Sequence, residues 1–213
     1  MLPIFKTLVP ESIITVANFL SLAECVRYIN LSELQGYEAA PITTDRGTEM
    51  RSEIRNNSRV ILDDSELAEN LWQRIADYIP QTINLPLAMD SDLIEKWSPI
   101  GLNERFRFYR YDRNQKFAPH HDGSYRRSQT EASKVTFMVY LNQEFTGGET
   151  KFDLRYPNAD LAVKPETGMA LCFLHHLRHQ GAPVIEGRKY VLRTDVMYRR
   201  EIIKQTSSIF RKS

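Results

Sequence analysis

The stretch Y-D-R-N-Q-K-F-A-P-H-H-D, from Tyr111 to Asp122, ends in a histidine and a carboxylate that are separated by one residue. On an extended strand, side chains alternate between the two faces, so His120 and Asp122 are expected to point the same way and His121 the opposite way. Two such groups on one face form a clamp for a metal ion. A second histidine from a distant strand would complete a 2-His-1-carboxylate set, which holds Fe(II) and leaves its other coordination positions open.

The third ligand is sought downstream, in the segment from Leu171 to Arg200. This segment carries three histidines and, after them, cations that could hold an anionic cosubstrate; these residues are His175, His176, His179, Lys189 and Arg193. On residue type alone, each of the three histidines is a candidate for the third ligand.

In these segments the sequence resembles the Fe(II)/2-oxoglutarate-dependent dioxygenases of the prolyl 4-hydroxylase-like branch. Three blocks carry the resemblance and occur in the family's order: H-H-D at 120–122, V-Y-L-N-Q-E-F-T-G-G-E-T-K-F at 139–152, and H-Q-G-A-P-V-I-E-G-R-K-Y at 179–190. The resemblance covers roughly residues 106 to 198. Together the blocks are much more specific than H-x-D alone, which is common by chance.

The resemblance implies His120, Asp122 and His179 as the metal ligands. In this family the last ligand lies four residues before a Pro-Val pair and ten before a basic residue, and Pro183-Val184 and Lys189 stand at those offsets from His179. Lys189 would then pair with the far carboxylate of 2-oxoglutarate, whose charge needs a partner inside the barrel.

Three further residues are candidates for contact with the cosubstrate. Arg193 lies four residues after Lys189, hence on the same strand face, and is the second candidate for the pairing with the carboxylate. Tyr111 and Tyr140 match tyrosines that contact 2-oxoglutarate in related hydroxylases. A packing role inside the barrel explains both tyrosines equally well.

The implied activity is hydroxylation of an unactivated C–H bond with Fe(II), 2-oxoglutarate and O2, with ascorbate as a further candidate cofactor and with succinate and CO2 as coproducts. The candidate substrates are peptidyl proline, a free amino acid or a small metabolite. The alternatives are a cupin-like metalloenzyme that uses another divalent metal and a non-catalytic module that binds 2-oxoglutarate or metal. Polar residues that could contact a substrate, although surface placement explains them as well, are Arg55, Asn56, Asn57, Arg107 and Asp112.

Composition narrows the class of protein. The 213 residues predict a single domain, which we divide into a support region at 1–102 and a catalytic core at 103–200. With 28 basic and 27 acidic residues, we expect no nucleic-acid or membrane partner, and the 2 cysteines predict neither a disulfide framework nor a thiolate metal site. The N-terminus does not fit a signal peptide, so we expect a cytoplasmic protein. The sequence does not indicate an oligomeric state.

Hydrophobic periodicity predicts an α+β fold that is mainly β. The topology, a double-stranded β-helix (jelly roll) core with N-terminal helices packed on one sheet, is implied by the resemblance. One helix is expected to begin at a capping box of Ser21 and Glu24 and to reach Gly36, and a second to run from a cap at 63–65 to Pro80. We also expect loops and short strands at 37–57, a short helical piece at 93–97 and a solvated end after Tyr198. Strands are expected at 12–19, 59–62, 105–111, 134–141, 150–152, 168–174 and 189–198.

Overall fold

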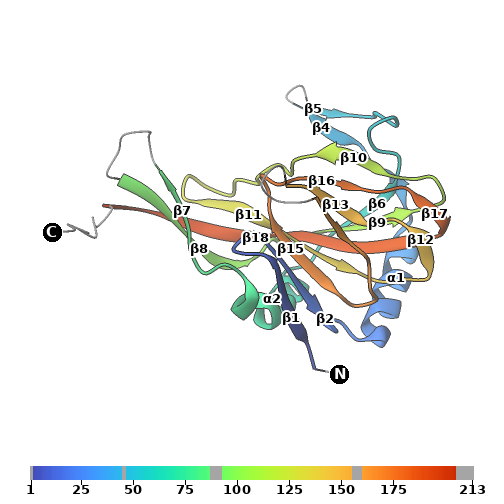
Figure 1. Cartoon of the computed structure of the whole chain (residues 1–213), viewed down its shortest axis with the longest axis horizontal. Coiled ribbons are helices and arrows are strands. Elements are labelled where there is room, and N and C mark those ends of the chain that lie inside the picture. The colour runs from blue at the N-terminus through green and yellow to red at the C-terminus, as the bar shows by residue number, and fades with distance from the viewer. Residues whose placement is uncertain (1, 45–46, 87–92, 155–159, 205–213) are drawn as a thin grey trace.

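The structure is a computed structural model that describes residues 2–44, 47–86, 93–154 and 160–204. Figure 1 shows three layers, with the helices below, a large sheet in the middle and a smaller sheet above. The large sheet runs in the order β1 (Ile4–Val9), β2 (Ile13–Ala17), β15 (Ala170–Leu174), β11 (Glu131–Tyr140), β18 (Lys189–Lys204), β9 (Arg105–Tyr111), β6 (Ser58–Asp63) and β3 (Glu38–Ala39), with β8 (Leu93–Leu102) on the far part of β18 and β7 (Ile83–Pro86) on β8.

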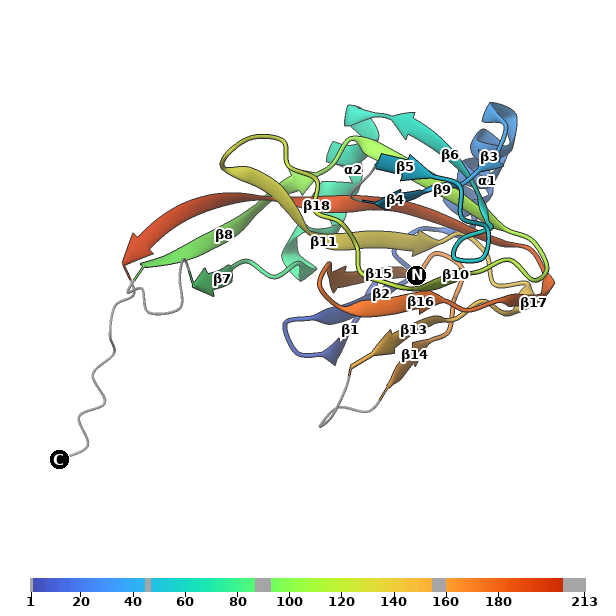
Figure 2. The ribbon, with the colours of Figure 1, turned by 90° about the horizontal axis from the view of Figure 1, so that it is seen from above.

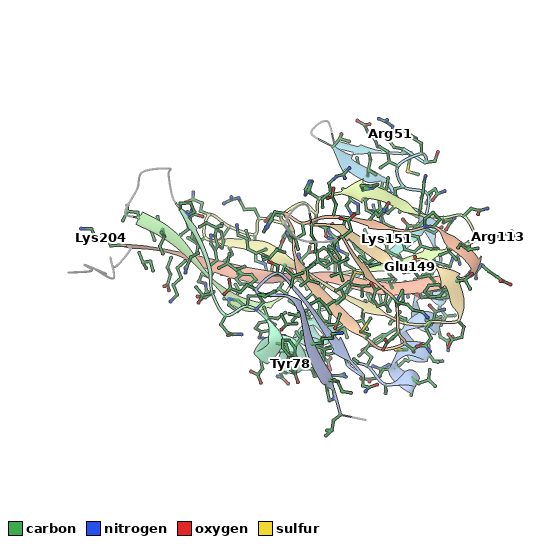
Figure 3. The ribbon with its side chains drawn as sticks, in the orientation of Figure 1. Arg51, Tyr78, Arg113, Glu149, Lys151 and Lys204 are labelled. Carbon is green, nitrogen blue, oxygen red and sulfur yellow. The ribbon has the colours of Figure 1, made fainter. Side chains whose placement is uncertain are left out.

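The smaller sheet carries part of the candidate site. It consists of β10 (Phe117–His120), β16 (Arg178–Gly181), β13 (Thr150–Asp153) and β14 (Leu161–Val163), in that order. Two further pairs are β12 (Phe145–Gly147) with β17 (Val184–Gly187), and β4 (Ile42–Thr44) with β5 (Gly47–Glu49). Figure 2 shows β10 and β16 lying across the large sheet, and Figure 3 labels Arg51, which follows β5 at the top of the molecule.

The period-two pattern of the central strands gives both faces of the large sheet an apolar layer. On β11, Phe137 and Val139 pack in the core shared with the helices, whereas Met138 and Tyr140 pack in the core between the two sheets. The residues of β9 alternate between the same two cores, and Phe108 packs in the one shared with the helices. Because both faces need cover, the helices protect one and the small sheet the other. The predicted jelly-roll core with helices on one sheet is confirmed.

The two helices begin as the sequence predicts, but the second ends early. In α1 (Leu22–Gln35) the Ser21 hydroxyl accepts from the Glu24 backbone N–H at 3.2 Å, and the Glu24 carboxylate accepts from the Ser21 N–H at 2.7 Å. In α2 (Ser65–Ile75) the Asp64 carboxylate accepts from the Leu67 N–H at 2.8 Å. The prediction that this helix reaches Pro80 is wrong, because a residue that precedes proline avoids the α conformation. The chain therefore tightens into a 3-10 turn, Ala76–Tyr78, and becomes extended at residue 79.

One sequence prediction fails at the arm that projects from the sheet in Figures 1 and 2, because the expected helical piece at 93–97 is part of β8. The end after Tyr198 is mostly exposed, as expected, but it continues β18 as far as Lys204, which Figure 3 labels at the tip of the arm. The two segments pair with each other, with Leu93 opposite Lys204. Their local patterns could not show this, since each depends on a partner about 100 residues away. The rest of the tail, 205–213, lies outside the described residues, and so do residues 87–92 and residues 45–46 of the segment expected to hold loops and short strands. Within the described ranges no helix is long and apolar enough to cross a bilayer.

Gly168 joins the connection between β2 and α1 to the central strands. Its N–H donates to the carbonyl of Tyr140 at 2.8 Å, and its own carbonyl accepts from the Leu20 N–H at 3.0 Å. Its φ is +78°, and a Cβ placed there would lie 2.1 Å from the Leu20 carbonyl oxygen. The position therefore requires glycine for its backbone conformation and for the closeness of its neighbour.

We expect Gly168→Ala to lower the free energy of unfolding by at least about 2 kcal/mol, because it adds a backbone clash to the cost of a positive φ. Gly36→Ala is the matched control, since Gly36 has a φ of +79° and nothing within 4 Å of its Cβ position. That variant has only the cost of its backbone conformation, at φ +79° and ψ +129°, which is about 1 to 3 kcal/mol, and it should lose less than Gly168→Ala. Chemical denaturation of both variants measures the difference, and equal losses would contradict the contact between Gly168 and Leu20.

Candidate active site

The three predicted ligands come from neighbouring parts of the small sheet. His120 ends β10, His179 lies on β16, and the two are directly opposite each other in the antiparallel register. Asp122 lies two residues beyond the end of β10, where its N–H donates to the carbonyl of His175 at 3.1 Å. The Nε2 atoms of His120 and His179 lie 3.7 and 3.6 Å from the carboxylate oxygens of Asp122. One ligand atom from each residue lies within 4.8 Å of the other two.

Backbone carbonyls set the tautomer of both histidines. Nδ1 of His120 lies 2.8 Å from the carbonyl of Ala118, and Nδ1 of His179 lies 3.0 Å from the carbonyl of Leu177. A carbonyl can only accept, so in each ring the proton is on Nδ1 and the lone pair is on Nε2. This is the usual support of a metal-binding histidine, and it directs both lone pairs toward Asp122. The donor set fits a divalent metal such as Fe(II).

The protonation states also suit metal binding. Burial lowers the pKa of His179 to about 4, so its imidazole is neutral at pH 7. Burial alone would raise the pKa of Asp122, but Arg193 and the two histidines hold that pKa well below its usual range. Arg193 Nη2 lies 2.9 Å from Asp122 Oδ1, and the Thr136 hydroxyl donates to Asp122 Oδ2 at 2.5 Å. Asp122 is thus a fixed, ionised carboxylate. Thr136, which lies on the strand face of β11 that the sequence predicts to line the pocket, supports it.

The neighbouring histidines lie elsewhere. His121 is exposed, with Nδ1 2.9 Å from the carbonyl of His176, as expected for a side chain on the opposite face. The imidazole of His176 is also exposed. His175 is buried, and its Nε2 lies 3.6 Å from Asp195. Of the three histidines after Leu171, only His179 belongs to the cluster.

A cavity leads from this cluster to Lys189, which is 3% exposed and begins β18. Its Nζ donates to the carbonyl of Gly148 at 2.6 Å and lies 5.3 and 5.2 Å from the ring centres of Tyr111 and Tyr140. Burial lowers the pKa of Lys189 to about 7. The positive charge of this buried ammonium is balanced only weakly by its neighbours, so the lysine is positioned to bind an anion.

The remaining predicted cosubstrate contacts divide into two groups. Tyr111 and Arg193 line the cavity together with His120, Asp122 and His179. Tyr140 is fully buried behind it, and its hydroxyl is 2.6 Å from that of Thr150, which does line the cavity.

A second, wider cleft of about 530 Å³ opens on the other side of His120 and Asp122. Of the predicted substrate-contacting residues, Arg55 and Arg107 line it. Asn57 instead holds the Arg55 side chain, Asn56 accepts from the Lys116 N–H, and Asp112 pairs with Arg188. The cleft is also lined by Arg59 and Asp195, which the sequence did not single out because each looks like an ordinary polar residue of a strand.

Comparison with known proteins agrees with this geometry. The sequence pattern of the 2OG-Fe(II) oxygenase superfamily matches residues 106–194. Prolyl 4-hydroxylase 1 of Arabidopsis thaliana is 25% identical over 201 residues, which cover 84% of this chain and 66% of the relative. The chain spans less than two thirds of the length of the curated relatives that it matches.

Solved structures share the fold. A viral collagen prolyl hydroxylase from Paramecium Bursaria Chlorella virus-1 aligns with a TM-score of 0.55 and 19% identity, over 88% of this chain and 96% of that one. A Trichoplax adhaerens prolyl hydroxylase, in complex with a peptide fragment of hypoxia inducible factor, aligns with a TM-score of 0.61 and 14% identity, over 88% and 84% of the two chains.

We expect Lys189→Met to raise the free energy of unfolding of the ligand-free protein by about 1 to 3 kcal/mol at pH 7, because it removes a buried charge. The pKa of Lys189 is lowered to about 7 from an ordinary 10.5, so between these values the unfolded chain binds more protons than the folded one. The stability of the unmodified protein therefore rises with pH over this window, and the advantage of methionine shrinks.

Denaturant titrations at several pH values measure this effect. The exposed Lys151, labelled on the surface in Figure 3, provides the control. Lys151→Met should change the free energy of unfolding by less than about 0.5 kcal/mol at every pH. A loss of stability in Lys189→Met would show that the lysine is compensated inside the protein.

Proposed function

We propose that this chain, a member of the 2OG-Fe(II) oxygenase superfamily through residues 106–194, is a prolyl 4-hydroxylase-like dioxygenase that hydroxylates an unactivated C–H bond. The observation that carries the proposal is the convergence of two Nε2 lone pairs and one ionised carboxylate within 4.8 Å, in a cavity that also holds a buried lysine. The prolyl hydroxylases among its relatives make a prolyl residue of a peptide the first substrate to test. A free amino acid and a small metabolite remain the other candidates.

Each residue has a defined part in this proposal. His120, Asp122 and His179 would hold Fe(II), and Lys189 would pair with the far carboxylate of 2-oxoglutarate. The bound metal, with 2-oxoglutarate and O2, supplies the oxidising power for hydroxylation, and 2-oxoglutarate leaves as succinate and CO2. The chain's own contribution is to orient these groups and to exclude water. Phe117 contributes to that exclusion, since its ring stacks on His120 with centroids 3.5 Å apart.

In this proposal Arg193 does not anchor 2-oxoglutarate. Its guanidinium lies 2.9 Å from Asp122 and 3.3 Å from Asp195, so its charge is already paired at the metal end of the cavity. Lys189 lies among Tyr111, Tyr140 and the Gly148 carbonyl, which carry no negative charge, so its ammonium is less compensated than the Arg193 guanidinium. We therefore assign the anchor to Lys189 and the positioning of Asp122 to Arg193.

The two alternatives explain less of the site. A cupin-like enzyme with another metal would use the same ligands, but it gives no reason for a desolvated ammonium deeper in the cavity. A non-catalytic module gives no reason to keep all three ligands together with a buried cation, and succinate formation distinguishes it from the enzyme. The expected cytoplasmic location and the expected lack of nucleic-acid and membrane partners stay predictions.

The direct test is succinate formation from 2-oxoglutarate by anaerobically purified protein after addition of Fe(II) and O2. We expect turnover in the unmodified protein and a fall of at least about 100-fold in Asp122→Ala, which loses the anionic ligand. His176→Ala is the matched control, because it removes an exposed neighbouring histidine outside the cluster. It should keep its activity. Absence of both iron binding and succinate formation in the unmodified protein, with prolyl peptides and amino acids present, would rule out the proposal.

The affinity for 2-oxoglutarate should depend on pH through Lys189. A bound carboxylate favours the charged lysine, whose pKa in the ligand-free site is about 7, so affinity should fall as pH rises above 7. We expect the dissociation constant to rise about fivefold to tenfold per pH unit between 7 and 8.5.

Titration of the Mn(II)-loaded protein with 2-oxoglutarate at each pH measures this dependence. Lys189→Arg, which stays charged, and Lys189→Met, which has no charge, should both give flat profiles. A flat profile in the unmodified protein would assign the anchor to another residue.

A further inference from the structure

The wider cleft beside the metal ligands is strongly basic. Its wall contains four arginines, Arg55, Arg59, Arg107 and Arg193, and only two carboxylates, those of Asp122 and Asp195. Asp122 is a proposed metal ligand, so its charge also serves the metal. The remaining side chains of the cleft leave a clear excess of positive charge that faces an open volume of about 530 Å³.

Arg55 is fixed in place with part of its guanidinium unused. The residue is 5% exposed, and its guanidinium lies between two rings, 4.5 Å from the centre of Tyr109 and 4.4 Å from that of Phe117. Its Nε donates to Asn57 Oδ1 at 2.8 Å, whereas its Nη2 is buried without a hydrogen-bond partner among the described residues. Buried donors are rarely left unpaired, so a missing acceptor is indicated.

The other arginines are placed close together by the register of the strands. Arg107 on β9 is directly opposite Arg193 on β18, and Arg59 on β6 is directly opposite Tyr109. Like charges that face each other across two strands are destabilising. Asp195 offsets part of this cost, at 3.8 Å from Arg107 and 3.3 Å from Arg193.

The compensation is incomplete. Nη1 of Arg107 and Nε of Arg193 are buried without hydrogen-bond partners in the described part of the chain. Burial lowers the pKa of Arg59, and the nearby Arg55 and Arg107 lower it further, which reports the same positive potential. The arrangement costs stability and leaves guanidinium donors without partners in the wall of the cleft.

We propose that this cleft binds a carboxylate of the substrate, so that the enzyme selects an acidic substrate. The inference rests on the proposed function and specifies its substrate. A carboxylate accepts paired N–H bonds from planar guanidinium groups, and it is the anion that both amino acids and acidic peptides carry. Its two sources are therefore the α-carboxylate of a free amino acid and an acidic side chain next to a prolyl residue.

Two matched pairs of probes test the proposal on protein loaded with Mn(II) and N-oxalylglycine, an unreactive analogue of 2-oxoglutarate. The first pair is N-acetyl-L-proline and its amide. The second is the blocked tripeptide acetyl-Glu-Pro-Gly-amide and its glutamine counterpart. By calorimetry we expect the acid of at least one pair to bind about tenfold or more tightly than its neutral partner. A charge-assisted hydrogen bond contributes enough binding free energy for a difference of this size. A preference in the first pair identifies the free amino acid as the source, and a preference in the second identifies the acidic peptide.

Variants connect this preference to the arginines. Arg59→Gln/Arg107→Gln should lose it, whereas Arg105→Gln should keep it. Arg105 lies on the same strand, but it is half exposed, pairs with Asp63 at 2.8 Å and does not line the cleft. If the double variant does not fold, as judged by its circular dichroism spectrum, Arg59→Gln alone replaces it.

Equal affinities within both pairs, including no detectable binding of any probe, would overturn the inference, as would a preference that survives in the arginine variant. Such a result in protein that still forms succinate would leave the dioxygenase proposal intact. Loss of succinate formation in the unmodified protein would instead defeat the proposed function.

Discussion

The structure depends on central strands that are buried on both faces. Alternate residues of β9 and β11 enter different cores, so one set of side chains packs on the helices and the other faces the small sheet. That second face carries Tyr111, Thr136 and Met138 into the cavity. The same alternation that stabilises the sheet thus supplies one wall of the candidate active site, while β10 and β16 supply the histidines on the other.

The site concentrates charge where the fold can least easily tolerate it. Asp122, Lys189 and Asp195 are all nearly inaccessible to solvent. Asp122 and Asp195 are paired with Arg193, whereas Lys189 donates to a neutral carbonyl, that of Gly148. A desolvated charge without an ionic partner costs free energy, so Lys189 lowers stability in the absence of ligands. A bound dicarboxylate would supply the missing partner. Function and stability therefore oppose each other at this end of the barrel.

The two cavities divide the chemistry. The inner one has the candidate metal ligands and Arg193 in one part of its lining and Lys189 in another, with aromatic and aliphatic side chains completing the wall, which suits a small anionic cosubstrate. The outer cleft is wider and contains four arginines, and it is also lined by residues next to the β4–β5 hairpin, such as Pro41 and Ile42. Both meet at His120 and Asp122, so a substrate in the outer cleft would lie against the metal. In our proposals the inner cavity holds the cosubstrate and the outer cleft selects the substrate.

The sequence by itself determined the parts that depend on short-range spacing. The alternation of residues 105–111 predicts β9, and the Ser21 capping box predicts the start of α1. The resemblance to the prolyl 4-hydroxylase-like branch adds His179 and Lys189, which the fold brings into one cavity. Only the tertiary structure decided what depends on partners distant in the chain. The pairing of β8 with the end of β18 replaced a predicted helix and lengthened a strand that was predicted to end at residue 198, and the β6–β9–β18 register placed Arg59 and Arg107 beside the candidate metal ligands. An arginine on a strand has the same local pattern whether it faces water or a cavity, because its environment is set by the strands that pair with it.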